Sequence, residues 1–120
     1  MIRSNKQTYR QRPNVYLTGN SNVNWADYVK SAYVNRINLI TATSESEETI
    51  KKSEALLVGW ADATDRKMLS EIEWAMDAGV PVIIWKRMGS EMPSSIKRSA
   101  VFVGEDLSEA IEHIIDCVSS

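Results

Sequence analysis

Two apolar runs separated by a helix-length segment constrain the fold of this chain more than any other feature. The runs at 55–60 (ALLVGW) and 80–85 (VPVIIW) have the length of buried strands, and the stretch from about Arg66 to Ala78 between them is amphipathic and predicts a helix. Two strands joined by a helical crossover lie parallel in one sheet. Ligands of such sheets sit beyond the carboxyl ends of the strands. The acidic turn from Asp62 to Asp65 is therefore expected at a ligand-binding edge.

The rest of the chain alternates between the same two kinds of segment. Further strands are predicted at Asn14–Thr18, Ile37–Thr41 and Val101–Val103, and further helices at Glu47–Ser53, at Ser94–Ser99, at Leu107–Val118 and around Trp25, Tyr28, Val29, Ala32 and Tyr33. Five strands alternating with helices predict an α/β fold, a single flavodoxin-like doubly wound domain with a five-stranded parallel sheet of order 2-1-3-4-5 and helices on both faces. We interpret residues 1–13 as a flexible lead-in and 14–120 as the domain.

Composition excludes several classes of function. The net charge of −2 over 120 residues argues against broad electrostatic capture of nucleic acid. The single Cys117 excludes an internal disulfide and any Cys-cluster metal site, and it fits a reducing compartment. No run approaches the roughly 20 apolar residues of a membrane span, and no signal peptide is visible. We therefore expect a cytoplasmic protein with no membrane partner.

The helix after the acidic turn carries the strongest candidate for chemistry. At roughly 100° per residue, its apolar stripe consists of Met68, Leu69, Ile72, Ala75 and Met76. Glu71 and Glu73 flank this stripe about 160° apart by the same geometry, so they cannot both face one pocket. Glu71 is close enough to the strand ends to reach a ligand there. Periodicity alone equally allows both to be solvated charges on the flanks of the helix.

Other polar and aromatic residues have a structural interpretation beside the functional one. Asp62 and Asp65 precede a helix, and Asp is a favoured N-cap, a role that still exposes the carboxylate at the ligand edge. Trp60 and Trp85 end neighbouring strands, where they would either stack on a heterocyclic base or cover the edge of the core. His113 lies far in sequence from the acidic residues, and we interpret it as structural or solvated.

The motifs around these residues resemble the nucleoside 2-deoxyribosyltransferase superfamily, which includes 2-deoxynucleoside 5-monophosphate N-glycosidases. The matching motifs span 14 to about 103: Tyr16-Leu17-Thr18-Gly19 at a first turn, Ser53-Glu54-Ala55-Leu56-Leu57 in a central strand, Glu71-Ile72-Glu73-Trp74-Ala75 in the helix, Gly79-Val80-Pro81-Val82, and Ser94-Ser95-Ile96-Lys97-Arg98-Ser99-Ala100. The chain departs from the family where Glu73 replaces a glycine and where Ser46 stands near the position of a second binding Asp.

The resemblance implies a site and a reaction. It makes Glu71 the catalytic nucleophile and Asp65 the residue that holds or protonates the departing base. Substrate would be bound by the remaining matched positions: Tyr16, Gly19, Ser46, Asp62, Ser94, Ser95 and Arg98. A carboxylate beneath the anomeric carbon stabilises the oxocarbenium-like state in which a 2-deoxyribosyl N-glycosidic bond breaks. The implied partner is a small deoxynucleoside or deoxynucleotide, with no cofactor and no metal, and the family also implies a homo-oligomer.

Two other classes of function fit the same sequence. One is a catalytically silent nucleotide-binding or regulatory module of the same fold, in which Asp65 only caps a helix. The other is a protein–protein module that uses Trp74 and Trp25 as surface anchors.

Overall fold

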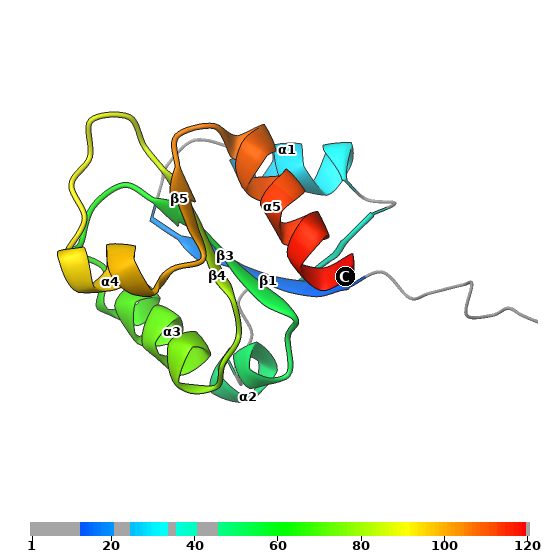
Figure 1. The fold of residues 1–120 in the computed structure, drawn as a ribbon, viewed down its shortest axis with the longest axis horizontal. Helices are drawn as coiled ribbons and strands as arrows, with labels where there is room; N and C mark the ends of the chain where they lie inside the picture. The colour runs from blue at the N-terminus through cyan, green and yellow to red at the C-terminus, as the bar shows by residue number, and fades with distance from the viewer. Residues whose placement is uncertain (1–12, 21–24, 34–35, 41–45, 120) are drawn as a thin grey trace, which may run out of the picture.

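The computed structural model describes residues 13–20, 25–33, 36–40 and 46–119, and these form an α/β sandwich (Figure 1). Strands and helices alternate along the chain: β1 (Asn14–Gly19), α1 (Trp25–Ala32), β2 (Asn38–Ile40), α2 (Ser46–Lys51), β3 (Ala55–Trp60), α3 (Arg66–Asp77), β4 (Val82–Lys86), α4 (Ser94–Ser99), β5 (Phe102–Gly104) and α5 (Leu107–Ser119). The strands form one parallel sheet of order β2-β1-β3-β4-β5. The predicted doubly wound, flavodoxin-like fold is confirmed.

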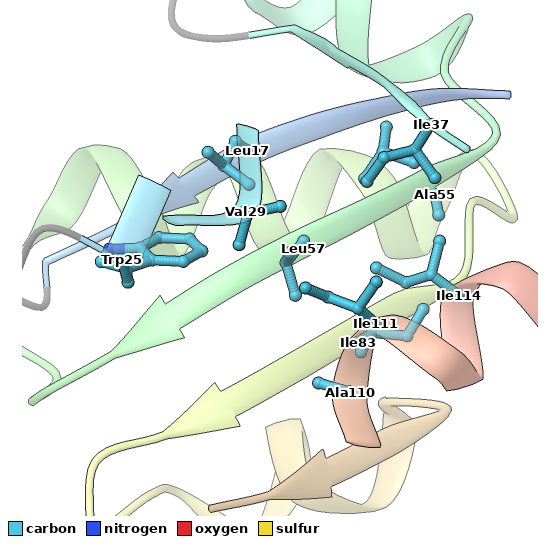
Figure 2. Packing of buried hydrophobic residues seen from close by; sticks show 11 residues of the cluster. Leu17, Trp25, Val29, Ile37, Ala55, Leu57, Ile83, Ala110, Ile111 and Ile114 are labelled. Atoms are coloured by element: carbon cyan, nitrogen blue, oxygen red, sulfur yellow. The ribbon is translucent and has the colours of Figure 1, made fainter. Parts of the chain in front are cut away.

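The two faces of the sheet pack against different helices, because successive side chains of a strand point to opposite faces. Helices α1 and α5 cover one face, and Figure 1 shows them on the side opposite to α2, α3 and α4. The core under α1 and α5 is apolar throughout, and Figure 2 shows α5 residues such as Ile111 and Ile114 directed at the sheet beside Leu57 and Ile83. The core under α2, α3 and α4 is built from alternate strand residues, among them Tyr16, Leu56 and Val58, packed against Met68, Ile72 and Ala75 of α3.

A close approach of β1, β3 and α1 depends on two glycines. Gly19 and Gly59 face each other in the register of β1 and β3. A Cβ on Gly59 would lie 2.5 Å from ring atoms of Trp25, so only glycine lets that indole pack flat on the strand. Gly19 has a φ of 143°, in the region that favours glycine. The turn after β1 is thereby held close to the end of β3.

Several element boundaries differ from the predicted ones. The fourth strand begins at Val82 rather than at residue 80, because the Val80 N–H donates to the Ala75 carbonyl at 2.8 Å and so takes part in the turn that follows α3. The last strand is Phe102–Gly104, one residue later than predicted, and Val101 is half exposed. The predicted lead-in at 1–13 lies outside the described residues except for Pro13. Thr41, the last residue of the second predicted strand, also lies outside them. Within the described part of the chain, no helix has the length and apolarity to cross a membrane.

Candidate functional site

The carboxyl ends of β1 and β3 are joined by one asparagine. The backbone N–H of Asn20 donates to the Gly59 carbonyl at 3.0 Å, and its side-chain Oδ1 accepts from the Ala61 N–H at 2.9 Å. Its Nδ2 donates to the carbonyl and to Oδ1 of Asp62, at 2.9 and 3.0 Å. The first turn and the acidic loop are therefore held together at the edge where parallel sheets bind ligands.

The two predicted loop carboxylates have different local roles. Asp62 accepts hydrogen bonds from the hydroxyl and the N–H of Thr64 and from Asn20, and these bonds, that of the Thr64 hydroxyl first, hold the pKa of its carboxyl below the ordinary value. Asp65 is the N-cap of α3, where its Oδ1 accepts from the Met68 N–H at 3.1 Å. The capping interpretation of Asp65 is confirmed, and the cap bond uses only one of its two oxygens.

Glu71 lies on the buried side of α3, against β1. Its side chain is 1% exposed, and it is the one charged residue in the interior of the described chain. Oε2 accepts from the Tyr16 hydroxyl at 3.1 Å and Oε1 from the Thr18 hydroxyl. Tyr16 and Thr18 are two residues apart on β1, so their side chains share the face that α3 covers. The strand therefore brings two hydroxyl donors to one carboxylate.

A lysine completes the environment of this carboxylate. Lys67 stands one helical turn before Glu71, and its Nζ lies 3.0 Å from Oε2. The hydrogen bond and charge of Glu71 raise the pKa of Lys67 above its ordinary value. The Lys67 side chain is 60% exposed. Glu71 itself is covered, so a ligand reaches it only after neighbouring side chains move.

The two glutamates of α3 are thus distinguished by burial. Glu73 is exposed, as the interpretation of a solvated flank predicts, whereas that interpretation is wrong for Glu71. Sequence reasoning singled out Tyr16 but not its contact with Glu71, and it missed Thr18 and Lys67. Two signals could have found them. Strand alternation places Thr18 beside Tyr16, and the i,i+4 spacing pairs Lys67 with Glu71.

The predicted phosphate-binding residues lie on a different side of α3. A groove of about 530 Å³ separates α3 from α4, and its lining includes Arg66, Glu73 and Ser95. Ser94, Ser95 and Arg98 are all exposed, and in the described part of the chain no hydrogen bond or ion pair joins α4 to Glu71. The side chain of Ser46 lies outside what the structure describes, although its backbone begins α2.

The aromatic residues are mostly structural. Trp60 is fully buried, and its Nε1 donates to the Glu91 carbonyl at 3.0 Å, which favours core packing over stacking on a base. Trp85 is half-buried and packs against Trp25, with ring centroids 5.6 Å apart. Trp25 is only 8% exposed, so its expected role as a surface anchor is wrong, because Gly59 lets the indole sink onto the sheet. His113 is exposed and lies against Phe102, as the structural or solvated interpretation expects.

The fold and site together define a doubly wound α/β domain with a buried carboxylate held beneath its first strand. No model of a known protein family matches the chain, and no curated protein matches its sequence. Among solved structures, its fold is similar to the catalytic subunit of cobaltochelatase from Mycobacterium tuberculosis, with a TM-score of 0.50 and 13% sequence identity. That similarity covers 75% of this chain and 8% of the cobaltochelatase chain. At this identity it supports the fold alone.

Proposed function

We propose that this protein cleaves or transfers the 2-deoxyribosyl N-glycosidic bond of deoxynucleosides or deoxynucleoside 5-monophosphates, with Glu71 as the nucleophile. One observation carries the proposal: the single charged side chain inside the described core is the glutamate that the motif resemblance singles out. Burying a carboxylate costs free energy even when it is hydrogen-bonded. Packing alone therefore does not account for a glutamate at this position, whereas a nucleophile protected from water does.

The reaction follows from ordinary carboxylate chemistry. An oxygen of Glu71 attacks the anomeric carbon as the bond to the base breaks, and the bonding electron pair leaves with the base nitrogen. Asp65, at the start of the same helix, holds the base and supplies or relays the proton that this nitrogen takes up. Water then releases the sugar in a hydrolase, or a second base does so in a transferase. Either acceptor restores the Glu71 carboxylate.

Substrate recognition is assigned by the same resemblance. Tyr16, Gly19, Ser46 and Asp62 would contact the sugar or the base. A 5-phosphate would be held by Ser94, Ser95 and Arg98 through hydroxyls and a guanidinium. Because α4 lies across α3 from Glu71 in the described chain, phosphate binding needs either a substrate that spans this distance or a site completed by a second copy. A homo-oligomer is part of the proposal because the family that the motifs resemble implies one.

A second candidate is a catalytically silent nucleotide-binding module of the same fold. Two observations favour it: Asp65 is engaged as a helix cap, and Glu71 is covered with all three described donors in place. This module would bind deoxynucleotides without breaking any bond. The loss of Glu71 would then leave binding intact.

Chromatography of the purified protein incubated with matched deoxy and ribo substrates tests the proposal. The panel should contain nucleosides and their 5-monophosphates, with and without a chelator. We expect release of free base from the deoxy series, because a ribose 2-hydroxyl crowds the nucleophile and disfavours the oxocarbenium-like state. Faster cleavage of ribo substrates, or activity abolished by the chelator, would contradict the proposed mechanism. Binding without any base release would favour the silent module.

A further inference from the structure

The two oxygens of the Glu71 carboxylate are not equivalent. An ionised carboxylate offers about four acceptor positions, two on each oxygen. Oε2 accepts from the Tyr16 hydroxyl at 3.1 Å and from the Lys67 ammonium at 3.0 Å, which fills both of its positions. Oε1 accepts from the Thr18 hydroxyl, which fills one of its two positions among the described residues. Oε1 is therefore the oxygen that still has an acceptor position to offer.

Lys67 differs from the other two donors in charge. Tyr16 and Thr18 bring neutral hydroxyls to a carboxylate that is 1% exposed, and only Lys67 brings a positive charge. Burial disfavours the charged form of a carboxyl group, whereas an ammonium within about 4 Å favours it. Lys67 is therefore the only one of the three described donors that brings an opposite charge to the Glu71 carboxylate.

Other charged groups near α3 do not replace this lysine. Asp65, at the start of the helix, is an acidic residue and brings no positive charge to Glu71. On α2, which packs beside α3, Lys51 pairs with Glu47, and Glu48 is exposed and acidic. On β4, Lys86 pairs with Glu105 at 3.6 Å. Lys67 is the cation that meets the Glu71 carboxylate within the described chain.

We propose that Lys67 is a positioning residue that keeps the buried Glu71 carboxylate ionised and holds its Oε2, so that Oε1 is the atom presented to a substrate. The part of this inference that concerns substrate rests on the proposed function, in which an oxygen of Glu71 bonds to the anomeric carbon. The part that concerns ionisation does not. It therefore has a readout of its own.

Infrared spectroscopy of the full chain near neutral pH measures the ionisation state directly. A protonated carboxylic acid has a carbonyl stretch separate from the stretches of a carboxylate. We expect this acid band in Lys67→Met but not in the wild type or in Lys67→Arg. The double variant Lys67→Met/Glu71→Gln should lack the band, which would assign the band to Glu71. The matched control is Lys51→Met, which removes another i,i+4 Lys–Glu pair with a 3.0 Å contact, but a half-exposed one. The absence of an acid band in Lys67→Met, or its presence in Lys51→Met, would overturn the proposal.

Turnover gives the second readout and separates the two proposals. If the protein cleaves or transfers deoxynucleosides, Lys67→Met should lower kcat at least roughly tenfold near neutral pH, because a carboxyl group that loses a neighbouring positive charge is more readily protonated. The kcat of this variant should recover as the pH rises. Lys67→Arg should keep most of the activity. A Lys67→Met enzyme with unchanged kcat would overturn the positioning role. An acid band in Lys67→Met from a protein that turns over no deoxynucleoside would support the role of Lys67 and contradict the proposed function.

Discussion

The two faces of the sheet are built from the same strands, yet they bury different chemistry. Among the described residues, the buried cluster under α1 and α5 is apolar (Figure 2). The face under α2, α3 and α4 is also lined by buried apolar residues, but near the carboxyl end of β1 it buries Glu71 in contact with two hydroxyls and an ammonium. The first core can be explained by burial of apolar surface alone. The second contains a charge whose burial opposes stability, and for this reason we propose that the functional site lies on this face.

The largest effect should come from the charge that distinguishes the second face. Glu71→Gln keeps the shape of the side chain and removes the nucleophile, so turnover should fall by roughly three or more powers of ten. The matched control is Glu73→Gln, an exposed residue two positions along the same helix. Base release measured by chromatography checks both variants, and circular dichroism checks the fold. Equal damage from Glu73→Gln, with Glu71→Gln nearly harmless, would show that the wrong glutamate was chosen.

Adjacent leucines on β3 allow the faces to be compared by stability. Leu57 packs under α5 and Leu56 beside Tyr16 on the other face, and both are fully buried. Truncation of either to Ala should lower the free energy of unfolding by about 2–5 kcal/mol. Only Leu56→Ala should also change the turnover per folded molecule, because Leu56 supports Tyr16. Denaturant titration and kcat together check this expectation. A change in kcat for Leu57→Ala as large as that for Leu56→Ala would remove the functional distinction between the faces.

Arg98 tests whether α4 belongs to the same site. If its guanidinium binds a 5-phosphate, Arg98→Ala should reduce the preference for monophosphates over nucleosides by about 1.5–3 kcal/mol, the usual worth of a hydrogen bond to a charged group. Lys97→Ala is the matched control, since it removes a neighbouring exposed charge. Competition between each monophosphate and its nucleoside measures the preference. Equal use of both forms by the wild type, unaltered by Arg98→Ala, would favour transfer between nucleosides and would place α4 outside the site.

The smallest expected effect is a loss of stability at low pH in the Asp62 loop, which lies at the carboxyl ends of the strands. The folded-state pKa of Asp62 is lowered, chiefly by the Thr64 hydroxyl. The stability it contributes is present above the pKa of the unfolded chain, about 3.9 for Asp, and is lost as the pH falls through the lower folded-state value. Asp62→Asn should therefore flatten the dependence of unfolding free energy on pH in this acid range. An unchanged dependence would show that the Asn20–Asp62–Thr64 contacts do not persist in solution.

The fold could be predicted from sequence because it follows from periodicity. The continuous apolar run at 55–60 and the helical stripe beginning at Met68 each identify an element without reference to the rest of the chain. The site depends instead on which residues meet after folding. Glu71 lies near the border of the apolar stripe, and whether it is buried is decided by the two hydroxyls that β1 places opposite it. The burial of Trp25 cannot be predicted from its own helix for a similar reason, since it depends on Gly59 of β3.

The most direct test of the central claim is to identify the carboxylate that bonds to the sugar. The wild-type protein should be quenched in acid during turnover of a deoxynucleoside, digested with trypsin, and the peptides 53–66 and 68–86 analysed by mass spectrometry. The first peptide contains Asp65, and the second contains both Glu71 and Glu73. We predict that a fraction of the second peptide carries a 2-deoxyribosyl group, that fragmentation places the group on Glu71, and that Glu73→Gln retains the modification. Modification of Glu73 or Asp65 instead, or turnover with no modified carboxylate at any quench time, would contradict the account.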